Sequence, residues 1–360
     1  MVAVGSMTGL GRRVPIARRG ISGLLESLLA VAGVLVLGAV LLAITGHDPV
    51  VAYRELVSRT LLRPTGVQEI LVRATPLLLA GCAVLVAAKV GVWNIGIDGQ
   101  VLVGALAGAI TADALTGAGR PWLWLGAALA GLVAGGVWGL VTALLRARLG
   151  INEIVTTIMF TYMAMSLTAW LVKGPLRDPS LVVPQTTVID RALRLPTLGD
   201  TRVHLGLVVA LLVTGVLGWV LQRTVVGYEL AVTGANPRAA RHGLIPVATY
   251  VLVAFVASGA IAGLAGVNDV LSTKGVFQAE WNPSYGLPAF ALVFLARRQV
   301  AGLVPAALFL GLLSYGADVM PRAAGVAPAF FEVLEGALLV ALALGAWARS
   351  RRGQLREDAP

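Results

Sequence analysis

The sequence has few charged residues and almost none of the side chains that bind metals or form disulfides. Of its 360 residues, 13% are charged, 58% are hydrophobic, three are histidine and one is cysteine. A soluble domain usually has about 25% charged residues. One cysteine excludes a disulfide framework and a CxxC metal site, and the scattered histidines lack metal-ligand spacing. We expect no metal site, and we expect Cys82, which lies inside an apolar run, to be a small buried hydrophobe.

The motifs of nucleotide binding and of common catalytic sites are also missing. The sequence contains no GxxxxGK[ST] phosphate loop, no HExxH and no GxSxG. The acids of the long apolar runs stand at their ends, whereas ion-driven carriers usually bury acids in mid-span and voltage sensors carry arginine ladders. These absences argue against an intramembrane enzyme and against self-powered transport. We expect a chain without a cofactor of its own.

What the sequence does have is a series of apolar runs about 20 residues long, the length a helix needs to cross about 30 Å of hydrocarbon. Transmembrane strands would instead alternate apolar and polar residues over about 10 positions. The pattern predicts an all-α polytopic membrane protein with one transmembrane domain over 24–347. The ten candidate spans are 24–45, 67–88, 99–118, 122–145, 153–172, 204–222, 244–267, 284–298, 299–317 and 328–347. The eighth and ninth are short and meet at Arg297-Arg298, a pair too costly to leave in lipid.

Basic residues indicate the orientation. The net charge of +10 could suggest a nucleic-acid partner, but its placement argues otherwise, because Lys and Arg gather on one set of loops. An excess of Lys and Arg marks the cytoplasmic face, which predicts a cytoplasmic segment 1–23, a cytoplasmic tail 348–360 and a cytoplasmic loop 223–243. The start resembles a signal peptide, but its apolar run is long enough to span and no small-residue cleavage site follows. We therefore expect an uncleaved first span.

Two stretches are expected outside. Residues 173–203 form the longest outer loop, in which four prolines discourage a helix. Residues 46–66 are partly amphipathic and are expected to lie along the outer surface as an interfacial segment.

A polar, glycine-rich break, KVGVWNIGIDGQ, separates the second and third spans at 89–100. Irregular backbone at membrane depth occurs where it is buried in protein or lines a cavity, and broken helices often frame a transport site. On one interpretation, Asn94, Asp98 and Gln100 line the translocation path. On the other, the segment is a tight cytoplasmic turn in which Asp98 caps the third span. The sequence leaves both open.

Two further acidic positions have the same ambiguity. Asn152 and Glu153 open the fifth span, where an acid is stabilised by the helix dipole, so capping is the favoured interpretation over a place near the path. Glu332 and Glu335 open the tenth span on one helix face. That face either lines a pore or caps an outer helix end. The GxxxG spacing of Gly131 and Gly135 is expected to serve helix packing.

The polar loop RTVVGYELAVTGANPRAARHG at 223–243 is the most informative stretch, because a membrane protein has little reason to gather such residues unless the loop meets something in water. We interpret it as a docking surface for a separate energy-supplying subunit. Asn236-Pro237 is a plausible helix start, and Arg238 and Arg241 would then share a face that could meet acids of that subunit. The alternative is that both arginines are ordinary positive-inside anchors.

Three segments carry a family resemblance. GVWNIGIDGQ resembles the FNIG-x-EGQ signature of permease subunits of ATP-binding-cassette (ABC) importers of the branched-chain amino acid and ribose type. LRARLGINEIVTTIMFTYMA and GYELAVTGANPRAARHGLI are similar to segments of the nucleoside-importer branch, the second being its cytoplasmic coupling loop. Trp93 stands where Phe is usual and Asp98 where Glu is usual. The resemblance covers roughly residues 65–345.

The resemblance implies the type II importer fold, with ten helices in two inverted halves, in a bacterial plasma membrane. It also implies partners: a second permease, usually different in the nucleoside branch, an ATPase holding ATP and magnesium on each coupling loop, and a substrate-binding lipoprotein. The expected solute is a nucleoside, with a simple sugar or a branched-chain amino acid as the alternative. The alternative functions of another class are a passive channel and an intramembrane enzyme.

The resemblance also implies roles for residues. Those carried over as the coupling element, with Arg241 added from its spacing, are Glu229, Gly234, Asn236, Pro237, Arg238, Ala239 and Arg241. The motif positions expected near the translocation path are Asn94, Asp98, Gln100, Asn152 and Glu153, and the aromatic residues considered for stacking on a solute are Trp93, Phe160 and Tyr162.

Overall fold

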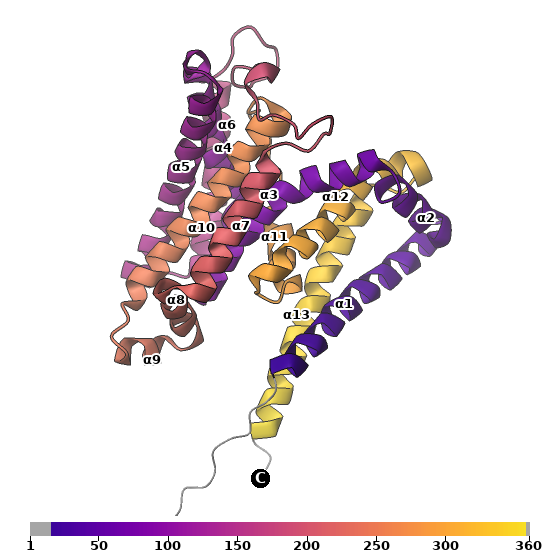
Figure 1. Ribbon diagram of the computed structural model, residues 1–360, viewed down its shortest axis with the longest axis vertical. Coiled ribbons are helices and arrows are strands. Elements are labelled where there is room, and N and C mark those ends of the chain that lie inside the picture. The colour runs from indigo at the N-terminus through magenta and orange to yellow at the C-terminus, as the bar shows by residue number, and fades with distance from the viewer. Residues whose placement is uncertain (1–15, 358–360) are drawn as a thin grey trace, which may run out of the picture.

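The computed structural model describes residues 16–357 and is built of helices (Figure 1). Within these residues, extended pairing is limited to two isolated bridges, Gln185 with Gln278 and Thr197 with His204. Seven helices of the described part are long and apolar enough to cross a membrane. The predicted all-α polytopic class is therefore confirmed.

Each of the ten apolar runs coincides with a helix. These helices are α1 (Ile16–Ile44), α3 (Pro64–Lys89), α4 (Ile97–Ala114), α5 (Arg120–Leu149), α6 (Glu153–Lys173), α7 (Gly206–Arg223), α10 (Val247–Asp269), α11 (Gly286–Leu295), α12 (Leu303–Ala324) and α13 (Ala329–Glu357). The remaining elements lie between them: α2 (Pro49–Thr60), α8 (Val225–Ala235), α9 (Pro237–His242), and the single turns η1 (Thr116–Ala118), η2 (Arg191–Leu193), η3 (Val270–Lys274) and η4 (Val300–Gly302).

Two helices differ in extent from the segments predicted from the sequence. The eighth predicted span, 284–298, contains only the 10-residue helix α11, which is about 15 Å long and so reaches across about half of the hydrocarbon layer. The predicted tail 348–360 is mostly helical, because α13 continues to Glu357 through residues that favour helix. Residues 1–15 and 358–360 of the predicted terminal segments lie outside the described residues.

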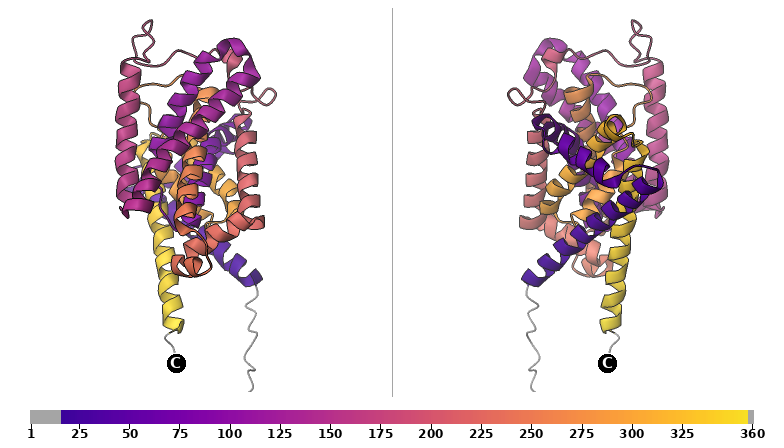
Figure 2. Two further views of the ribbon diagram at one scale, coloured as in Figure 1. Left: turned by 90° about the vertical axis from the view of Figure 1, so that its left-hand side faces the viewer. Right: turned by 90° about the vertical axis from the view of Figure 1, so that its right-hand side faces the viewer.

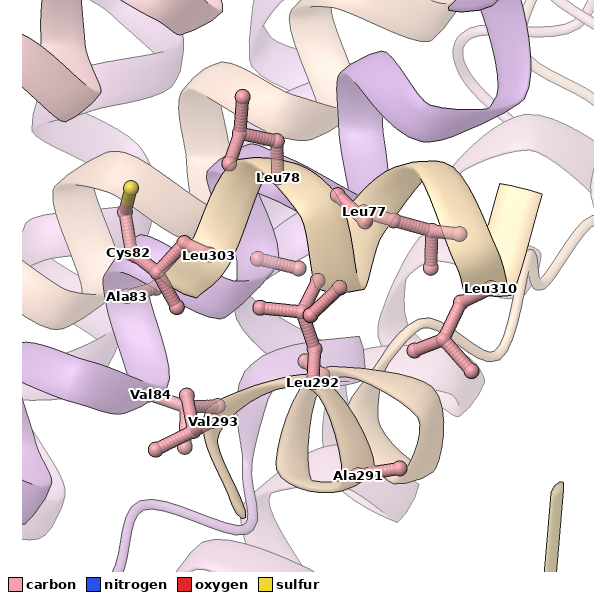
Figure 3. Packing of buried hydrophobic residues seen from close by; sticks show 14 of the residues in the cluster. Leu77, Leu78, Cys82, Ala83, Val84, Ala291, Leu292, Val293, Leu303 and Leu310 are labelled. Carbon is pink, nitrogen blue, oxygen red and sulfur yellow. The ribbon is translucent and has the colours of Figure 1, made fainter. Parts of the chain in front are cut away.

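Helix α3 runs through the middle of the molecule, and every residue from Ala74 to Ala88 is buried. Its side chains meet those of α11 and α12 in one cluster, in which Val84 lies beside Val293 and Cys82 lies beside Leu303 (Figure 3). Cys82 belongs to this cluster, is fully buried, and has its Sγ 3.3 Å from Thr214 Oγ1. The prediction of a buried, apolar environment for this cysteine is confirmed.

Glycines hold α5 against α10. A Cβ on Gly135 would lie 2.9 Å from the Gly263 Cα, and a Cβ on Gly259 would lie 3.0 Å from the Gly135 carbonyl carbon. Such distances leave no room for a side chain, so the GxxxG spacing of Gly131 and Gly135 serves packing within the chain, as expected.

The molecule has two distinct ends (Figures 1 and 2). Helices α8 and α9 lie at one end, together with the start of α1 and the end of α13. The long loop 174–205 lies at the opposite end, toward which α2 is also displaced. The loop predicted to be cytoplasmic thus shares a side with the start of α1 and the end of α13, while the predicted outer loop lies across from them.

Candidate functional site

The break between α3 and α4 is buried and internally bonded. It begins at Gly91, whose φ of +81° is a left-handed conformation that favours glycine. Asn94 and Gln100 are each 1% exposed. Asn94 Nδ2 donates to Gln100 Oε1 at 2.8 Å and to Ser258 Oγ of α10 at 2.9 Å, while Asn94 Oδ1 accepts from the Gly96 N–H at 3.2 Å. These bonds satisfy the irregular backbone inside protein, as buried breaks require.

Asp98 does not cap its own helix. The N-cap position of α4 is Gly96, which makes no side-chain capping bond. Asp98 Oδ1 instead accepts the backbone N–H of Gly286 at 2.7 Å, at the start of α11. A Cβ on Gly286 would lie 2.7 Å from Asp98 Oδ2, so a larger residue there would have to displace this carboxylate. The interpretation of Asp98 as the cap of the third span is wrong, because its carboxylate stabilises the N-terminus of a helix 188 residues later.

Trp93 packs on the same short helix. Its ring is stacked on Phe294 with centroids 5.8 Å apart and lies 6.0 Å from the ring of Phe290. The guanidinium of Arg298 lies 5.9 Å from the Trp93 ring centroid, a cation–π contact. Of the other two aromatics considered for stacking, Phe160 packs edge-on against Trp138 at 5.6 Å and Tyr162 is 62% exposed on α6.

Asn152 and Glu153 form the start of α6. Asn152 is its N-cap and accepts from the Ile154 N–H at 2.9 Å. The carboxylate of Glu153 lies 3.2 Å from Nε of Arg146, near the end of α5. Asn152 therefore caps α6, which was the favoured interpretation, whereas Glu153 lies in the first turn of α6 and pairs with Arg146. A place of either residue near a translocation path stays a prediction.

The predicted coupling loop folds as two short helices, α8 and α9. Asn236 is the N-cap of α9, and its Oδ1 accepts from the N–H groups of Arg238 at 3.0 Å and Ala239 at 3.1 Å. Pro237 occupies the first helical position, so the predicted helix start is confirmed. Arg238, Ala239 and Arg241 are exposed, while Ala240 is fully buried beneath them.

Two residues of the coupling loop face inward instead. Gly234 packs against the carbonyl of Lys89, and a Cβ on Gly91 would lie 3.3 Å from the Gly234 oxygen. Glu229 accepts a hydrogen bond from the hydroxyl of Tyr250, near the start of α10. Gly234 and Glu229 therefore attach this loop to the first break and to α10.

A cavity of about 820 Å³ lies between α3, α10, α12 and α13, beside the irregular segment 275–285 that follows η3. Its charged and aromatic lining residues are Glu69, Arg73, Asp269, Lys274, Trp281, Tyr285, Asp318, Phe331, Glu332 and Glu335. Glu332 and Glu335 thus face a cavity, which favours the pore-lining interpretation over capping. None of Trp93, Asn94, Asp98, Gln100, Asn152 and Glu153 is in the lining.

Two polar pairs organise the cavity wall. Arg73 of α3 forms an ion pair with Asp318 of α12, and its Nη1 lies 3.3 Å from Ser314 Oγ. Asp269, at the end of α10, is 6% exposed and accepts from the hydroxyl of Tyr285. The backbone of Tyr285 precedes Gly286, which Asp98 holds. Asp98, in the first turn of α4 after the first break, therefore positions the irregular segment 275–285, which we call the second break and which forms part of the cavity wall.

Comparison with known proteins identifies the family. Residues 66–343 match the family described as the permease component of the branched-chain amino acid transport system. The chain belongs to this permease family.

Three relatives span nearly the whole permease. A glucose ABC transporter permease of Haloferax volcanii is 34% identical over 328 residues, covering 87% of this chain and 85% of the relative. A guanosine ABC transporter permease of Bacillus subtilis is 30% identical over 349 residues, covering 94% and 98%. A nucleoside ABC transporter permease of Lactococcus lactis is 27% identical over 330 residues, covering 89% and 90%. The permease is a multi-pass membrane subunit of an ABC importer and not an enzyme.

The long loop 174–205, which is the predicted outer loop, holds the second break of the permease in place. The N–H of Ile189 donates to the Gly275 oxygen at 2.8 Å, and the N–H of Thr186 donates to the Phe277 oxygen at 3.0 Å. Lys173 Nζ lies 2.9 Å from Glu280 Oε1. The loop is irregular apart from η2, as its prolines predict, and its backbone bonds give the cavity a fixed wall.

Sequence reasoning missed the cavity residues Arg73, Asp269, Tyr285 and Asp318. Arg73 carried a usable signal, because an arginine inside an otherwise apolar span is usually functional. Asp269 carried none, since its neighbours in the cavity come from segments far away in the sequence.

Proposed function

We propose that this permease imports nucleosides, with a simple sugar as the second candidate. Two of the three relatives carry guanosine or nucleoside in their names, and the third carries glucose. The observation that supports this class is the cavity, which combines carboxylates with the rings of Trp281, Tyr285 and Phe331. A branched-chain amino acid would favour an apolar cavity and would bring a carboxylate of its own toward these acids.

We infer that a cytoplasmic ATPase docks on α9 and the adjoining turn. Arg238 and Arg241 share an exposed face there. Leu244 follows with 92% of its surface exposed and a φ of 60°, which is rare for a bulky residue. We take this exposed leucine and the two arginines together as the centre of the proposed docking surface. The ATPase would bind ATP and magnesium, and this chain would bind neither.

The same orientation places the cavity and the outer loop toward the outside, where a substrate-binding lipoprotein would deliver the solute. Both chain ends would then be cytoplasmic. We further propose that a second permease pairs with this one. The pair would be a heterodimer, as is usual in the nucleoside branch.

We also propose that the chain has ten membrane helices in two inverted halves. Gly91 and Gly275 both have positive φ, 81° and 71°, and each is followed by valine, an aromatic residue and a side-chain amide. Helices α3 and α10 precede the two breaks and run in opposite directions, since α3 ends and α10 begins beside α8. The short helix α11 would correspond to α4.

The proposed mechanism starts at α9. Closure of the ATPases on binding ATP would push α8 and α9, which contact the first break through Gly234. Movement of this break would carry Asp98, and with it the start of α11 and the cavity wall. The pore would then change between an outward-open and an inward-open state. This change would require no ionisable group of α8 or α9 to gain or lose a proton.

The test is uptake by cells that express the complete transporter and lack their own nucleoside carriers. We expect ATP-dependent accumulation of labelled guanosine or adenosine that unlabelled ribonucleosides suppress and leucine does not. Accumulation of labelled glucose alone would establish the sugar candidate instead. Leucine uptake alone would contradict both candidates.

A further inference from the structure

The cavity has an uneven charge balance. Its lining contains five carboxylates, from Glu69, Asp269, Asp318, Glu332 and Glu335, but only two basic groups, from Arg73 and Lys274. A concave surface lined by one sign of charge focuses the field and repels solutes of the same sign. The cavity therefore disfavours anions such as phosphorylated compounds.

Ion pairs account for two of the five cavity carboxylates, which leaves the excess negative charge on the other three. Asp318 is paired with Arg73, and Glu69 Oε1 lies 2.6 Å from Nη1 of Arg202. Among residues 28–345, whose side chains the structure describes, no ion pair involves Asp269, Glu332 or Glu335. Glu332 and Glu335 stand on the same face of α13, and Asp269 approaches from α10. These three carboxylates are acceptors that two different helices bring to one cavity.

Ionised carboxylates accept short, strong hydrogen bonds from hydroxyl groups, and an acidic side chain on a ribose hydroxyl is a common way to recognise that sugar. Asp269 already accepts one such bond, from the Tyr285 hydroxyl. A solute with two adjacent hydroxyls could bond to both oxygens of one carboxylate or span two of them.

Aromatic rings supply the flat side of the site. Trp281 packs edge-on against Phe277, with ring centroids 5.5 Å apart. Trp281 also borders a second hollow of about 470 Å³, which includes Lys173, Gln278 and Glu280 and lies under the outer loop. The side chain of Trp281 thus borders both the main cavity and this second hollow.

We propose that the cavity is a solute-binding site selective for neutral sugar rings with vicinal hydroxyls, which Asp269, Glu332 and Glu335 receive while Trp281 contacts the flat face. A volume of about 820 Å³ accommodates a nucleoside with its water, within the usual range for ligand sites. This proposal deepens the proposed function and rests on it for the class of solute. Nucleosides and free hexoses share the chemistry, and the experiment separates them.

The experiment measures protection of an introduced thiol. Ser284 lines the cavity and is exposed, and the native Cys82 is fully buried, so a Ser284→Cys variant offers one accessible thiol. The permease–ATPase complex is reconstituted in proteoliposomes without binding protein, and a charged thiol reagent is added from the cavity side. A Ser180→Cys variant on the outer loop, away from the cavity, is the matched control.

We expect millimolar guanosine to slow labelling of Ser284→Cys at least threefold and to leave labelling of Ser180→Cys unchanged. The 2′,3′-dideoxy analogue and guanosine 5′-monophosphate should give no protection. Protection by guanosine but not glucose assigns the site to nucleosides, and the reverse assigns it to hexoses. Equal protection by the dideoxy analogue or by the monophosphate overturns the proposal, as does a lack of protection by every solute.

A second comparison tests the named acids. In the Ser284→Cys background, Asp269→Asn should reduce the protection of the thiol by guanosine at least threefold. The double variant Glu332→Gln and Glu335→Gln should allow guanosine 5′-monophosphate to protect the thiol. Asp113→Asn, an acid of α4 outside the cavity, should change neither. If guanosine is taken up by cells but these variants protect like the parent, the site assignment fails and the proposed function stands. If only glucose protects, the nucleoside assignment fails and the hydroxyl site stands.

Discussion

The two breaks of this permease begin alike and end differently. Each follows a long buried helix and starts at a glycine of positive φ, Gly91 or Gly275, followed by valine, an aromatic residue and an amide. In the first break the amide, Asn94, is 1% exposed and bonded to α10. In the second break the amide, Gln278, is exposed and reaches only Gln185 of the outer loop, at 3.4 Å.

The difference shows that a glycine of positive φ determines where a helix ends. It does not determine whether the segment that follows is buried in protein or borders a cavity. The first break lies against Gly234 of the coupling loop and is filled by protein. The second lies under the outer loop and borders the cavity. Asp98 joins them, because it belongs to the helix after the first break and bonds the backbone at the end of the second.

The largest expected effect is at the exposed end of the coupling loop. Reversing charge with Arg238→Glu and Arg241→Glu should lower transport-coupled ATP hydrolysis about tenfold or more, because like charges across an interface cost several kcal/mol. Membrane insertion should be normal. The measurement is ATPase activity of the purified complex with and without solute-loaded binding protein.

Arg148→Glu is the control for this pair, since Arg148 is an exposed arginine near the end of α5 and lies outside the coupling loop. Normal coupling in the Arg238 and Arg241 double variant would show that both arginines are only membrane anchors.

Substitution of the two amides, Asn94 and Gln278, tests the comparison between the breaks most sharply. Asn94→Ala leaves Gln100 and Ser258 with unmet hydrogen bonds in a buried site and should destabilise the fold by about 2 kcal/mol. Gln278→Ala, at the matching place in the exposed break, should stay within about 0.5 kcal/mol. Thermal unfolding in detergent measures both. Similar losses from the two variants would mean that both breaks are equally buried.

A smaller effect should follow pH. His204, just before α7, is 3% exposed, and neither ring nitrogen has a hydrogen-bond partner among residues 16–357. Burial lowers the pKa of His204 from 6.5 to about 4. The unfolded chain therefore binds a proton that the folded chain does not, and stability is lost as the pH falls from about 6.5 to about 4, by up to about 3 kcal/mol.

Thermal unfolding between pH 7 and pH 4 checks this. His204→Gln should flatten the acid side of the profile. An unchanged slope in that variant would assign the acid sensitivity to other groups.

The sequence predicts the helices of this fold better than the tertiary contacts between them. Runs of about 20 apolar residues identify the membrane helices, because length and hydropathy are local properties. The start of α9 at Pro237 is equally local. The partner of Asp98 is not, since Gly286 lies 188 residues away and only the folded chain brings them together.

The cavity shows the same limit. Glu332 and Glu335 were recognised as sharing a face, because helical spacing fixes that. Whether the face meets a cavity depends on Arg73, Asp269 and Tyr285, which arrive from α3, α10 and the second break. Asn94 and Gln100 were assigned to the path from a motif, but their side chains bond each other and Ser258.

The bond from Asp98 to Gly286 tests the account most directly, because through it the coupling loop would move the cavity wall. The measurement is the labelling rate of Ser284→Cys in the permease–ATPase complex, with and without a non-hydrolysable ATP analogue. We predict that the analogue changes this rate severalfold in the parent and in Asp98→Asn, whose amide oxygen still accepts the Gly286 N–H, and leaves it unchanged in Asp98→Ala. A parental response in Asp98→Ala would contradict the account.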